Sequence, residues 1–236
     1  MQRYFATEKI NNKIILSNDD YHHIKKVMRM NNNDKIEVVY DNNLYIANIN
    51  SIEDMDIEIV ESINQVDDKY PKICLIIPAL KEQKLDLILQ KSTELGVSEI
   101  IVAPFSRSMV KYDNRKEKVK LDRWQKICKE ASEQSKRVDI PLVRLENNFD
   151  FTDSMDGLKL ICSTVEKDNY IKKFLKKEEC YDKLIVAIGP EGGISPEEED
   201  KLVNKGFTRI SLGSQIMRVE TVPIFLASII RYEYTE

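Results

Sequence analysis

Apolar and polar residues alternate over short runs in the first 68 residues, and many of the apolar ones are β-branched. A period of two places successive side chains on opposite faces of an extended chain, so each run predicts a β-strand. The polar sequence Asp41-Asn42-Asn43 separates two runs and predicts a hairpin turn. The expected strands cover residues 3–7, 13–16, 35–40, 44–50 and 57–63. We therefore expect a small, mostly β domain over residues 1–70.

One helix is expected within this domain, and a linker at its end. An aspartate at position 19 or 20 is the expected N-cap, and four apolar residues then recur on one helix face. These four are Tyr21, Ile24, Val27 and Met28. The polar stretch 64–69, which precedes Pro71, has the composition of a linker.

From residue 73 onward, apolar runs alternate with segments of helical period. The expected strands cover residues 73–78, 97–103, 142–145, 158–162 and 184–188, and helical stripes occupy 85–95, 121–131 and 221–232. Fully apolar strands that alternate with helices are typical of parallel sheets buried on both faces. We therefore expect an α/β domain over residues 71–236, with helices on both sides of a mainly parallel sheet. Trp124 lies on an apolar stripe and is expected in the core.

A glycine-rich loop, Gly189-Pro190-Glu191-Gly192-Gly193, directly follows one predicted strand. Ser195 and Glu198 then form a capping box, Pro196 takes the first helical position, and Gly206 ends the helix. Ligands of open α/β sheets bind beyond the carboxyl ends of strands, so this loop is expected to line a pocket. The acidic helix start repels phosphate, and the chain lacks both the dinucleotide fingerprint and the P-loop motif. A dinucleotide or triphosphate ligand is therefore disfavoured.

A second strand end with a glycine follows at residues 210–213. The chain has only seven glycines, and five of them lie between Gly189 and Gly213. Such clustering is explained if the main chain needs positive φ angles or approaches a ligand closely. Two ordinary turns are the alternative explanation.

Composition and charge narrow the class of protein. A hydrophobic fraction of 42% argues against disorder, and 36 basic against 40 acidic residues give a net charge of −4. No apolar run reaches the roughly 18 residues of a membrane span and no signal peptide is evident, so we expect a cytoplasmic protein. Four cysteines without a CxxC pair, and two adjacent histidines, argue against a metal site or disulfide framework. Residues 107–137 hold eleven basic and five acidic residues, which indicates either a face for polyanions or a solvated helix.

Six segments along the chain form a combined pattern. They are Met1-Gln2-Arg3-Tyr4-Phe5, His22-His23-Ile24-Lys25-Lys26-Val27-Met28-Arg29, Phe105-Ser106-Arg107-Ser108, Glu130-Ala131-Ser132-Glu133-Gln134-Ser135-Lys136-Arg137, the loop 189–193, and Leu212-Gly213-Ser214-Gln215-Ile216-Met217-Arg218-Val219-Glu220-Thr221. Taken in this order, the segments resemble the RsmE family of SPOUT-class enzymes, which methylate N3 of a uridine in 16S ribosomal RNA. The chain departs from the family pattern at Lys136, Gln215 and Val222, where the family often has a glycine, a basic residue and an alanine. Asn31-Asn32-Asn33 replaces a glycine-containing turn, which asparagine's tolerance of left-handed angles permits.

The resemblance implies a PUA-like β-barrel over residues 1–70 and a SPOUT methyltransferase domain over 71–236 with a C-terminal trefoil knot. It also implies a homodimer, S-adenosylmethionine as cofactor, and 16S ribosomal RNA in the assembled small subunit as partner. The cofactor-binding residues that it implies are Ser163, Thr164, Ile188, Gly189, Pro190, Glu191, Gly192, Gly193, Leu212, Gly213, Ile216, Met217 and Arg218.

Methyl transfer from a sulfonium is a direct displacement, so the enzyme mainly aligns donor and acceptor and needs no metal. N3 of uracil lies on the pairing edge, so the base must be unpaired and the anion left after proton loss must be stabilised. Arg218 is our candidate for stabilising this anion, and Glu191 or Glu220 for accepting the proton. The alternative for Arg218 is a structural ion pair with one of these two glutamates.

Further basic residues are candidates for contact with RNA. Arg107 and Arg137 are expected to bind phosphates or the target base, and the N-terminal helix is expected to present a basic patch. The remaining candidates are Arg3, His22, Lys25, Lys26 and Arg29. A non-catalytic RNA-binding protein and a methyltransferase for another RNA position remain as alternatives. A hydrolase or dehydrogenase lacks the expected motifs.

Overall fold

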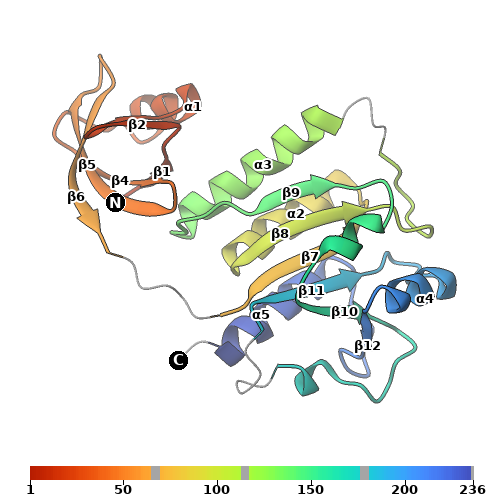
Figure 1. Cartoon of the computed structure of the whole chain (residues 1–236). Coiled ribbons are helices and arrows are strands. Elements are labelled where there is room, and N and C mark those ends of the chain that lie inside the picture. The colour runs from red at the N-terminus through yellow and green to blue at the C-terminus, as the bar shows by residue number, and fades with distance from the viewer. Residues whose placement is uncertain (65–69, 113–116, 176–180, 235–236) are drawn as a thin grey trace. The chain divides into compact units, whose positions relative to one another are not determined.

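The computed structural model describes residues 1–64, 70–112, 117–175 and 181–234. The chain divides into two compact units, which can be followed in Figure 1. The first unit comprises Met1–Asp67 and Lys129–Asp139, and the second comprises Asp68–Cys128 and Ile140–Glu236. Except for Asn64, the predicted linker lies outside the described residues.

The first unit is a six-stranded sheet whose two ends are joined by a bend between β1 and β2, the first two strands along the chain. The strand order is β1 (Arg3–Phe5), β4 (Lys35–Tyr40), β5 (Asn43–Ser51), β6 (Asp56–Ile63), β3 (Lys13–Ile15) and β2 (Glu8–Ile10). Only Ala6 and Thr7 separate β1 from β2, although these strands lie at opposite ends of the order. Ala6 N donates to Val39 O at 2.8 Å and Thr7 N donates to Ile15 O at 2.8 Å. The bend therefore joins the two ends of the sheet, as in a small barrel. The sequence pattern missed β2, because its residues are mostly polar or charged.

The predicted hairpin turn is confirmed, with φ of 48° at Asp41 and 57° at Asn42 between β4 and β5. Two consecutive left-handed residues match the strand twist of a tight hairpin. Asn33 has φ of 72°, so asparagine does adopt the left-handed angle in the turn where the family has glycine.

The helix of the first unit differs from expectation in its cap and in its buried face. Helix α1 (Asn18–His22) is capped by Ser17, whose Oγ accepts from Asp20 N at 3.2 Å, so neither aspartate is the N-cap. Asp20 instead completes the capping box from within the first turn. A π-helical turn, η1 (His23–Val27), then interrupts the helical period. For this reason Val27 and Met28 are 60% and 43% exposed, and only Ile24 of the predicted face is fully buried.

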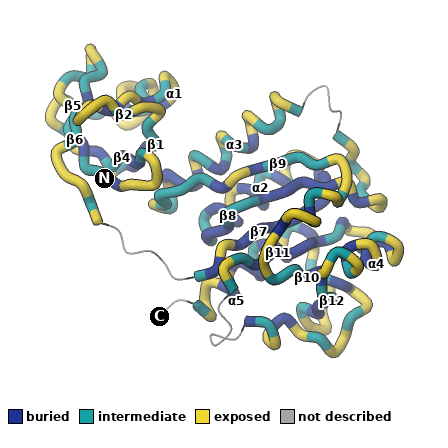
Figure 2. The backbone as a smooth tube through the Cα atoms, viewed as in Figure 1, coloured by how far each residue is buried: buried dark blue, intermediate teal, exposed yellow. Residues whose placement is uncertain are grey.

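The second unit is built on a six-stranded sheet whose strands all run parallel, as predicted. The order is β12 (Thr208–Ile210), β10 (Leu158–Cys162), β11 (Lys183–Ile188), β7 (Lys72–Pro78), β8 (Val97–Ala103) and β9 (Leu142–Leu145). The central strands β7 and β11 are buried from their second residue onward, and the dark-blue segments at the centre of this unit in Figure 2 mark such buried residues. Apolar residues along whole strands, without alternation, follow from burial of both faces.

Helices cover both faces of this sheet, which confirms the predicted α/β class. Helices α2 (Glu82–Glu94), α3 (Glu117–Gln134) and α5 (Thr221–Tyr234) pack on one face, where Trp124 is 2% exposed in the core. Helix α4 (Pro196–Asn204) and the 3-10 turn η3 (Asp150–Ser154) cover the other face. The last turns of α3, from Lys129 onward, belong to the first unit.

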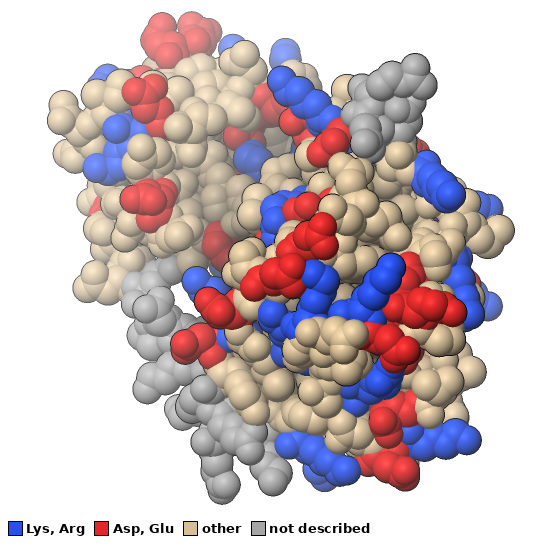
Figure 3. Space-filling view, turned by 45° about the vertical axis from the view of Figure 1, so that its right-hand side comes forward, with Lys and Arg blue, Asp and Glu red and all other residues tan. Residues whose placement is uncertain are grey.

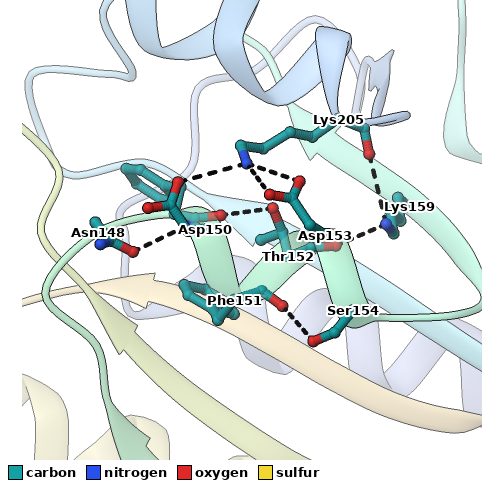
Figure 4. Close-up of polar contacts among 9 residues, drawn as sticks. Asn148, Asp150, Phe151, Thr152, Asp153, Ser154, Lys159 and Lys205 are labelled. Atoms are coloured by element: carbon teal, nitrogen blue, oxygen red, sulfur yellow. Dashed lines mark hydrogen bonds and ion pairs between the residues drawn. The ribbon is translucent and has the colours of Figure 1, made fainter.

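The turn η3 is fixed by lysines that reach it from β10 and from the end of α4 (Figure 4). Lys205 Nζ lies 2.6 Å from the carboxylate of Asp153 and 3.6 Å from that of Asp150. Lys159 Nζ donates to Thr152 O at 2.8 Å and to Lys205 O at 3.5 Å. These contacts hold the turn against the apolar side chains beneath it.

The capping box at the start of α4 is confirmed. Ser195 Oγ accepts from Glu198 N, the carboxylate of Glu198 accepts from Ser195 N, and Pro196 is the first helical residue.

We predict that Ser195→Ala lowers the free energy of unfolding by about 1 kcal/mol, because the main-chain N–H of Glu198 at the helix start loses its acceptor. Urea unfolding followed by the fluorescence of Trp124, which lies in the same unit, measures this change. Ser195→Thr keeps the acceptor and serves as the control, and equal stability of the Ala and Thr variants would contradict the role of the cap.

Candidate active site

A pocket of about 580 Å³ lies at the carboxyl ends of β10, β11 and β12. It is walled by the segments that follow these strands, within residues 162–170, 188–194 and 211–222. Twelve of the thirteen residues expected to bind a cofactor line it, and Gly192 is the exception. The lining members of that set are Ser163, Thr164, Ile188, Gly189, Pro190, Glu191, Gly193, Leu212, Gly213, Ile216, Met217 and Arg218. The two glycine-bearing strand ends therefore face one pocket.

The glycines of this pocket are required by main-chain geometry. A Cβ on Gly189 would lie 2.6 Å from Ile194 Cγ1 and 2.9 Å from Ile194 N, so no side chain fits. Gly193 has φ of 72° and Gly213 has φ of 122°, which side chains disfavour. Gly193 N also donates to Pro190 O at 2.8 Å and closes the loop into a tight turn.

Residues of the segment after β8 form hydrogen bonds to the glycine-rich loop and to the helix that follows it. The Arg107 guanidinium donates to Gly192 O at 3.0 Å and to Ile194 O at 3.5 Å. Ser106 donates to the carboxylate of Glu198 from its N, at 2.6 Å, and from its Oγ, at 2.9 Å. Arg107 is exposed, but its guanidinium is already engaged in supporting the loop.

A buried polar group supports the first pocket segment, after β10. Ser163 is 8% exposed, and its Oγ donates to Glu199 Oε2 at 3.3 Å. Arg209 Nε donates to the same oxygen at 2.8 Å. Because the carboxylate of Glu199 comes from α4, it ties this segment to the helix that follows the glycine-rich loop.

Lys84 is a site residue that the sequence pattern did not indicate. Its Nζ lies 2.6 Å from Glu191 Oε1 and 3.5 Å from Glu220 Oε2, so it contacts both candidate proton acceptors. The hydrogen bond from Lys84 holds the pKa of Glu191 below its ordinary value, so this carboxylate is ionised at neutral pH. Glu191 lines the pocket, whereas Glu220 does not.

Arg218 lies at the pocket and is exposed. The two glutamates considered as its partners are both engaged by Lys84. Its guanidinium makes no hydrogen bond or ion pair with any residue in the described ranges. The structural pairing offered as the alternative for Arg218 is therefore not what the structure shows.

Two of the arginines expected to contact RNA have protein partners in the first unit. Arg3 is 5% exposed, pairs with Glu37 at 2.8 Å, and donates to the carbonyls of Lys136 and Arg137. The Arg137 side chain is 10% exposed and pairs with Asp139 at 2.7 Å. Lys136 has φ of 63°, which is consistent with a position where the family has glycine. Both guanidiniums stabilise this part of the unit.

The remaining candidates for RNA contact are on or next to η1. His22, Lys25, Lys26 and Arg29 are exposed, and we call these four residues the η1 patch. His23 differs from its neighbour, because its Nδ1 lies 3.0 Å from the buried hydroxyl of Tyr4.

The described residues of the basic stretch, 107–112 and 117–137, do not form a face of one sign, because several of their cations have acidic partners. On the side of the molecule seen in Figure 3, basic and acidic side chains are interspersed. The ion pairs are Arg123 with Asp86, Lys129 with Asp20 and Glu133, Lys136 with Glu37, and Arg137 with Asp139.

Within the described ranges, no helix is long and apolar enough to cross a membrane. No cluster of three or more His, Cys, Asp or Glu side chains there is placed to hold a metal ion.

Comparison with known proteins first defines the class. Residues 68–231 match the family model described as an RNA methyltransferase domain, and residues 16–61 match the one described as an RNA methyltransferase PUA domain. The fold and the two matches together define an RNA methyltransferase with a PUA-like domain preceding its α/β domain.

The relatives then define the family within this class. The chain is 32% identical to the ribosomal RNA small subunit methyltransferase E of Bacillus subtilis, covering 99% of this chain and 97% of the relative. It is 35% identical to the enzyme of the same name from Mesomycoplasma hyopneumoniae, covering 96% and 97%. The chain therefore belongs to the family of ribosomal RNA small subunit methyltransferases E, the RsmE family.

Solved structures agree with this assignment. A methyltransferase from Legionella pneumophila, in complex with bound S-adenosylmethionine, is similar with a TM-score of 0.87 and 27% identity over 98% of this chain and 97% of that one. The ribosomal RNA small subunit methyltransferase E of Neisseria gonorrhoeae, bound to S-adenosylmethionine, is similar with a TM-score of 0.84 and 26% identity, covering 99% and 98%. The trefoil knot that the resemblance implies stays a prediction.

The close approach at Gly189 gives a testable prediction. We expect Gly189→Ala to destabilise the second unit, because its Cβ would lie within 3 Å of the main chain and side chain of Ile194. Gly192→Ala is the matched control, because a Cβ there lies at an ordinary 3.4 Å from Arg107 and no positive φ is required. Thermal unfolding should show a lower Tm for Gly189→Ala than for Gly192→Ala. Equal Tm values would contradict the crowding of this loop.

Proposed function

We propose that this protein transfers a methyl group from S-adenosylmethionine to N3 of a uridine in the 16S ribosomal RNA of the small subunit. The observation that carries the proposal is that both glycine-bearing strand ends and Arg218 line the same pocket. The family assignment supports methylation of ribosomal RNA, and two similar structures contain S-adenosylmethionine. The choice of N3 of uridine comes from the resemblance to the RsmE family and from the chemistry of Arg218.

The pocket fits S-adenosylmethionine in size and in lining. Its volume of about 580 Å³ is in the range of small-molecule pockets, roughly 300–1,000 Å³. Ile188, Leu212 and Val222 supply apolar surface for a flat ring, and the glycines leave main-chain groups accessible. When bound, the cofactor supplies an electrophilic methyl group, so the task of the chain is to align donor and acceptor.

Arg218 has the charge and the position to stabilise the uracil anion. N3 carries a weakly acidic proton, and the negative charge left by its departure has to be balanced in the pocket. Arginine stays protonated at any physiological pH and cannot itself take the proton. Glu191 is ionised and lines the pocket, so we assign it as the proton acceptor, directly or through a water molecule. A carboxylate of lowered pKa is a weak base, so most of the lowering of the barrier to proton removal has to come from anion stabilisation by Arg218.

We assign the first unit to RNA binding, through the η1 patch rather than through Arg3 or Arg137. The patch combines exposed cations with the exposed apolar side chains Val27 and Met28. Phosphate contacts need accessible cations, which buried and paired arginines do not provide. We further propose a homodimer in which the partner covers the open side of the pocket, where Ile216 is 86% exposed.

The reaction is tested by complementing a deletion strain and analysing its 16S ribosomal RNA by mass spectrometry. We expect the strain to lack one N3-methyluridine and the wild-type gene to restore it. Arg218→Ala should reduce methylation by about a hundredfold or more, the size of effect seen when one anion-stabilising donor is removed. Arg218→Lys keeps the charge and should retain part of the activity.

Calorimetric titration with S-adenosylmethionine separates binding from chemistry in the same variants. Wild type and Arg218→Ala should both bind the cofactor. A protein that binds RNA but no cofactor would refute the enzyme proposal, and full methylation by Arg218→Ala would refute the role of this arginine.

The η1 patch gives a separate prediction. Reversing the charges of Lys25, Lys26 and Arg29 to glutamate should weaken RNA binding and flatten its salt dependence, with a slope reduced by about two to three phosphate contacts. The control reverses Lys9, Lys13 and Lys35, which lie on or at the strands of the same unit. Binding titrations over a range of salt concentrations measure both quantities, and an equal loss in both variants would remove the patch from the RNA-binding surface.

A further inference from the structure

Lys84 occupies a position that its own helix disfavours. It is the third residue of α2, and Lys81 precedes the helix as an N-cap without a side-chain cap bond. Unpaired N–H groups give the start of a helix partial positive charge, so a cation in the first turn is locally unfavourable. A residue that breaks a local rule is explained by contacts elsewhere in the fold or by function.

The contacts of Lys84 join two separate walls of the pocket. Its Nζ lies 2.6 Å from Glu191 in the glycine-rich loop and 3.5 Å from Glu220, two residues after Arg218. The side chain of Glu220 is 17% exposed, and its Oε2 is buried without a hydrogen bond, so Lys84 supplies the nearest positive charge. Two carboxylates brought together without this cation would repel each other.

The same contacts determine whether an acidic residue is left to pair with Arg218. Glu191 and Glu220 are the acidic residues that the sequence placed near Arg218, and both face Lys84 instead. An arginine that forms an ion pair is held in place and partly neutralised, and is less effective toward a developing anion. Both carboxylates are thus engaged by a cation other than Arg218.

We propose that Lys84 is a positioning residue for methyl transfer, which engages Glu191 and Glu220 so that the Arg218 guanidinium stays available to the uracil. This inference rests on the proposed function, because it assigns Arg218 its ligand. The competing explanation is that Lys84 forms ordinary, partly exposed ion pairs, which contribute little.

Activity measurements on four variants separate the two explanations. Lys84→Met should lower the single-turnover rate about tenfold or more, a partial loss of anion stabilisation, while the Kd for S-adenosylmethionine changes much less. Lys84→Arg should retain most of the rate. The control Lys91→Met removes a lysine from the same helix that pairs with Glu94, and should behave as wild type.

A further variant is the double substitution Lys84→Met with Glu220→Gln. It removes one of the two carboxylates that Lys84 no longer engages, so the rate should recover in part. A purely structural role also predicts recovery, because Glu220→Gln removes a buried carboxylate that has lost its cation. The two explanations differ in whether the Arg218 guanidinium itself becomes paired in Lys84→Met, which the exchange measurement below reports. A double variant no faster than Lys84→Met, or Lys84→Met as fast as Lys91→Met, would overturn the proposal.

A readout without RNA or cofactor keeps this inference distinct from the proposed function. Nitrogen NMR of the arginine side chains, with Arg218 assigned from the Arg218→Lys variant, reports how fast its Nε–H exchanges with water. We expect slower exchange in Lys84→Met, because Arg218 then pairs with a glutamate, and faster exchange in the double variant, where one of the two glutamates is gone. Identical exchange in wild type and Lys84→Met would refute the inference even if the enzyme methylates RNA. Absence of methylation by wild type would instead refute the proposed function.

Discussion

The pocket depends on the close return of the main chain at Gly189. Ile194 is 8% exposed and packs into the core cluster on the α4 side of the sheet, so the loop between these residues is anchored at its far end. The return is possible because Gly189 has no side chain where Ile194 passes. The Arg107 guanidinium then donates to the carbonyls of Gly192 and Ile194, and Glu198 accepts from Ser106 N, which holds the segment of Arg107 next to the start of α4. The position of the glycine-rich loop, and with it that of Glu191, therefore follows from core packing and from these hydrogen bonds.

Charged side chains of this protein fall into two groups. Some form ion pairs that stabilise the fold, and others are exposed cations that can bind a ligand. Buried or half-buried carboxylates such as Glu37, Glu199 and Asp20 each have a cation within 3 Å, as desolvated charges require. Pairs of this kind fix geometry, but they leave little charge for a ligand. A cation that is to bind phosphate or an anionic base has to be one for which the protein supplies no carboxylate. Arg218 in the second unit and Lys25, Lys26 and Arg29 in the first are exposed residues that suit this purpose.

Sequence reasoning predicted those features that local rules determine. The strands Val97–Ala103, Leu142–Leu145 and Leu158–Cys162 have the predicted bounds, because their apolar runs end at clear turn signals. The face of the first helix was wrong, because the π-turn changes the period that placed Val27 and Met28 inside. Lys84 and Arg107 could not be found in this way. Their contacts join positions 107 and 85 residues apart, and only the folded sheet brings such positions together.

The resemblance to a family selected two segments that line one pocket, but it could not say which arginines of its motifs have no partner within the protein. Arg3, Arg107 and Arg137 occur in motif segments, as Arg218 does. The first three were candidates for contact with RNA, and Arg218 was the candidate for stabilising the uracil anion. The structure separates them by what each guanidinium already binds: a carboxylate and two carbonyls for Arg3, loop carbonyls for Arg107, and Asp139 for Arg137. An arginine whose donors are used within the protein can be retained in a family for folding alone. Arg218 has no such partner among the described residues and lines the pocket, so its place in the motif is best explained by a ligand.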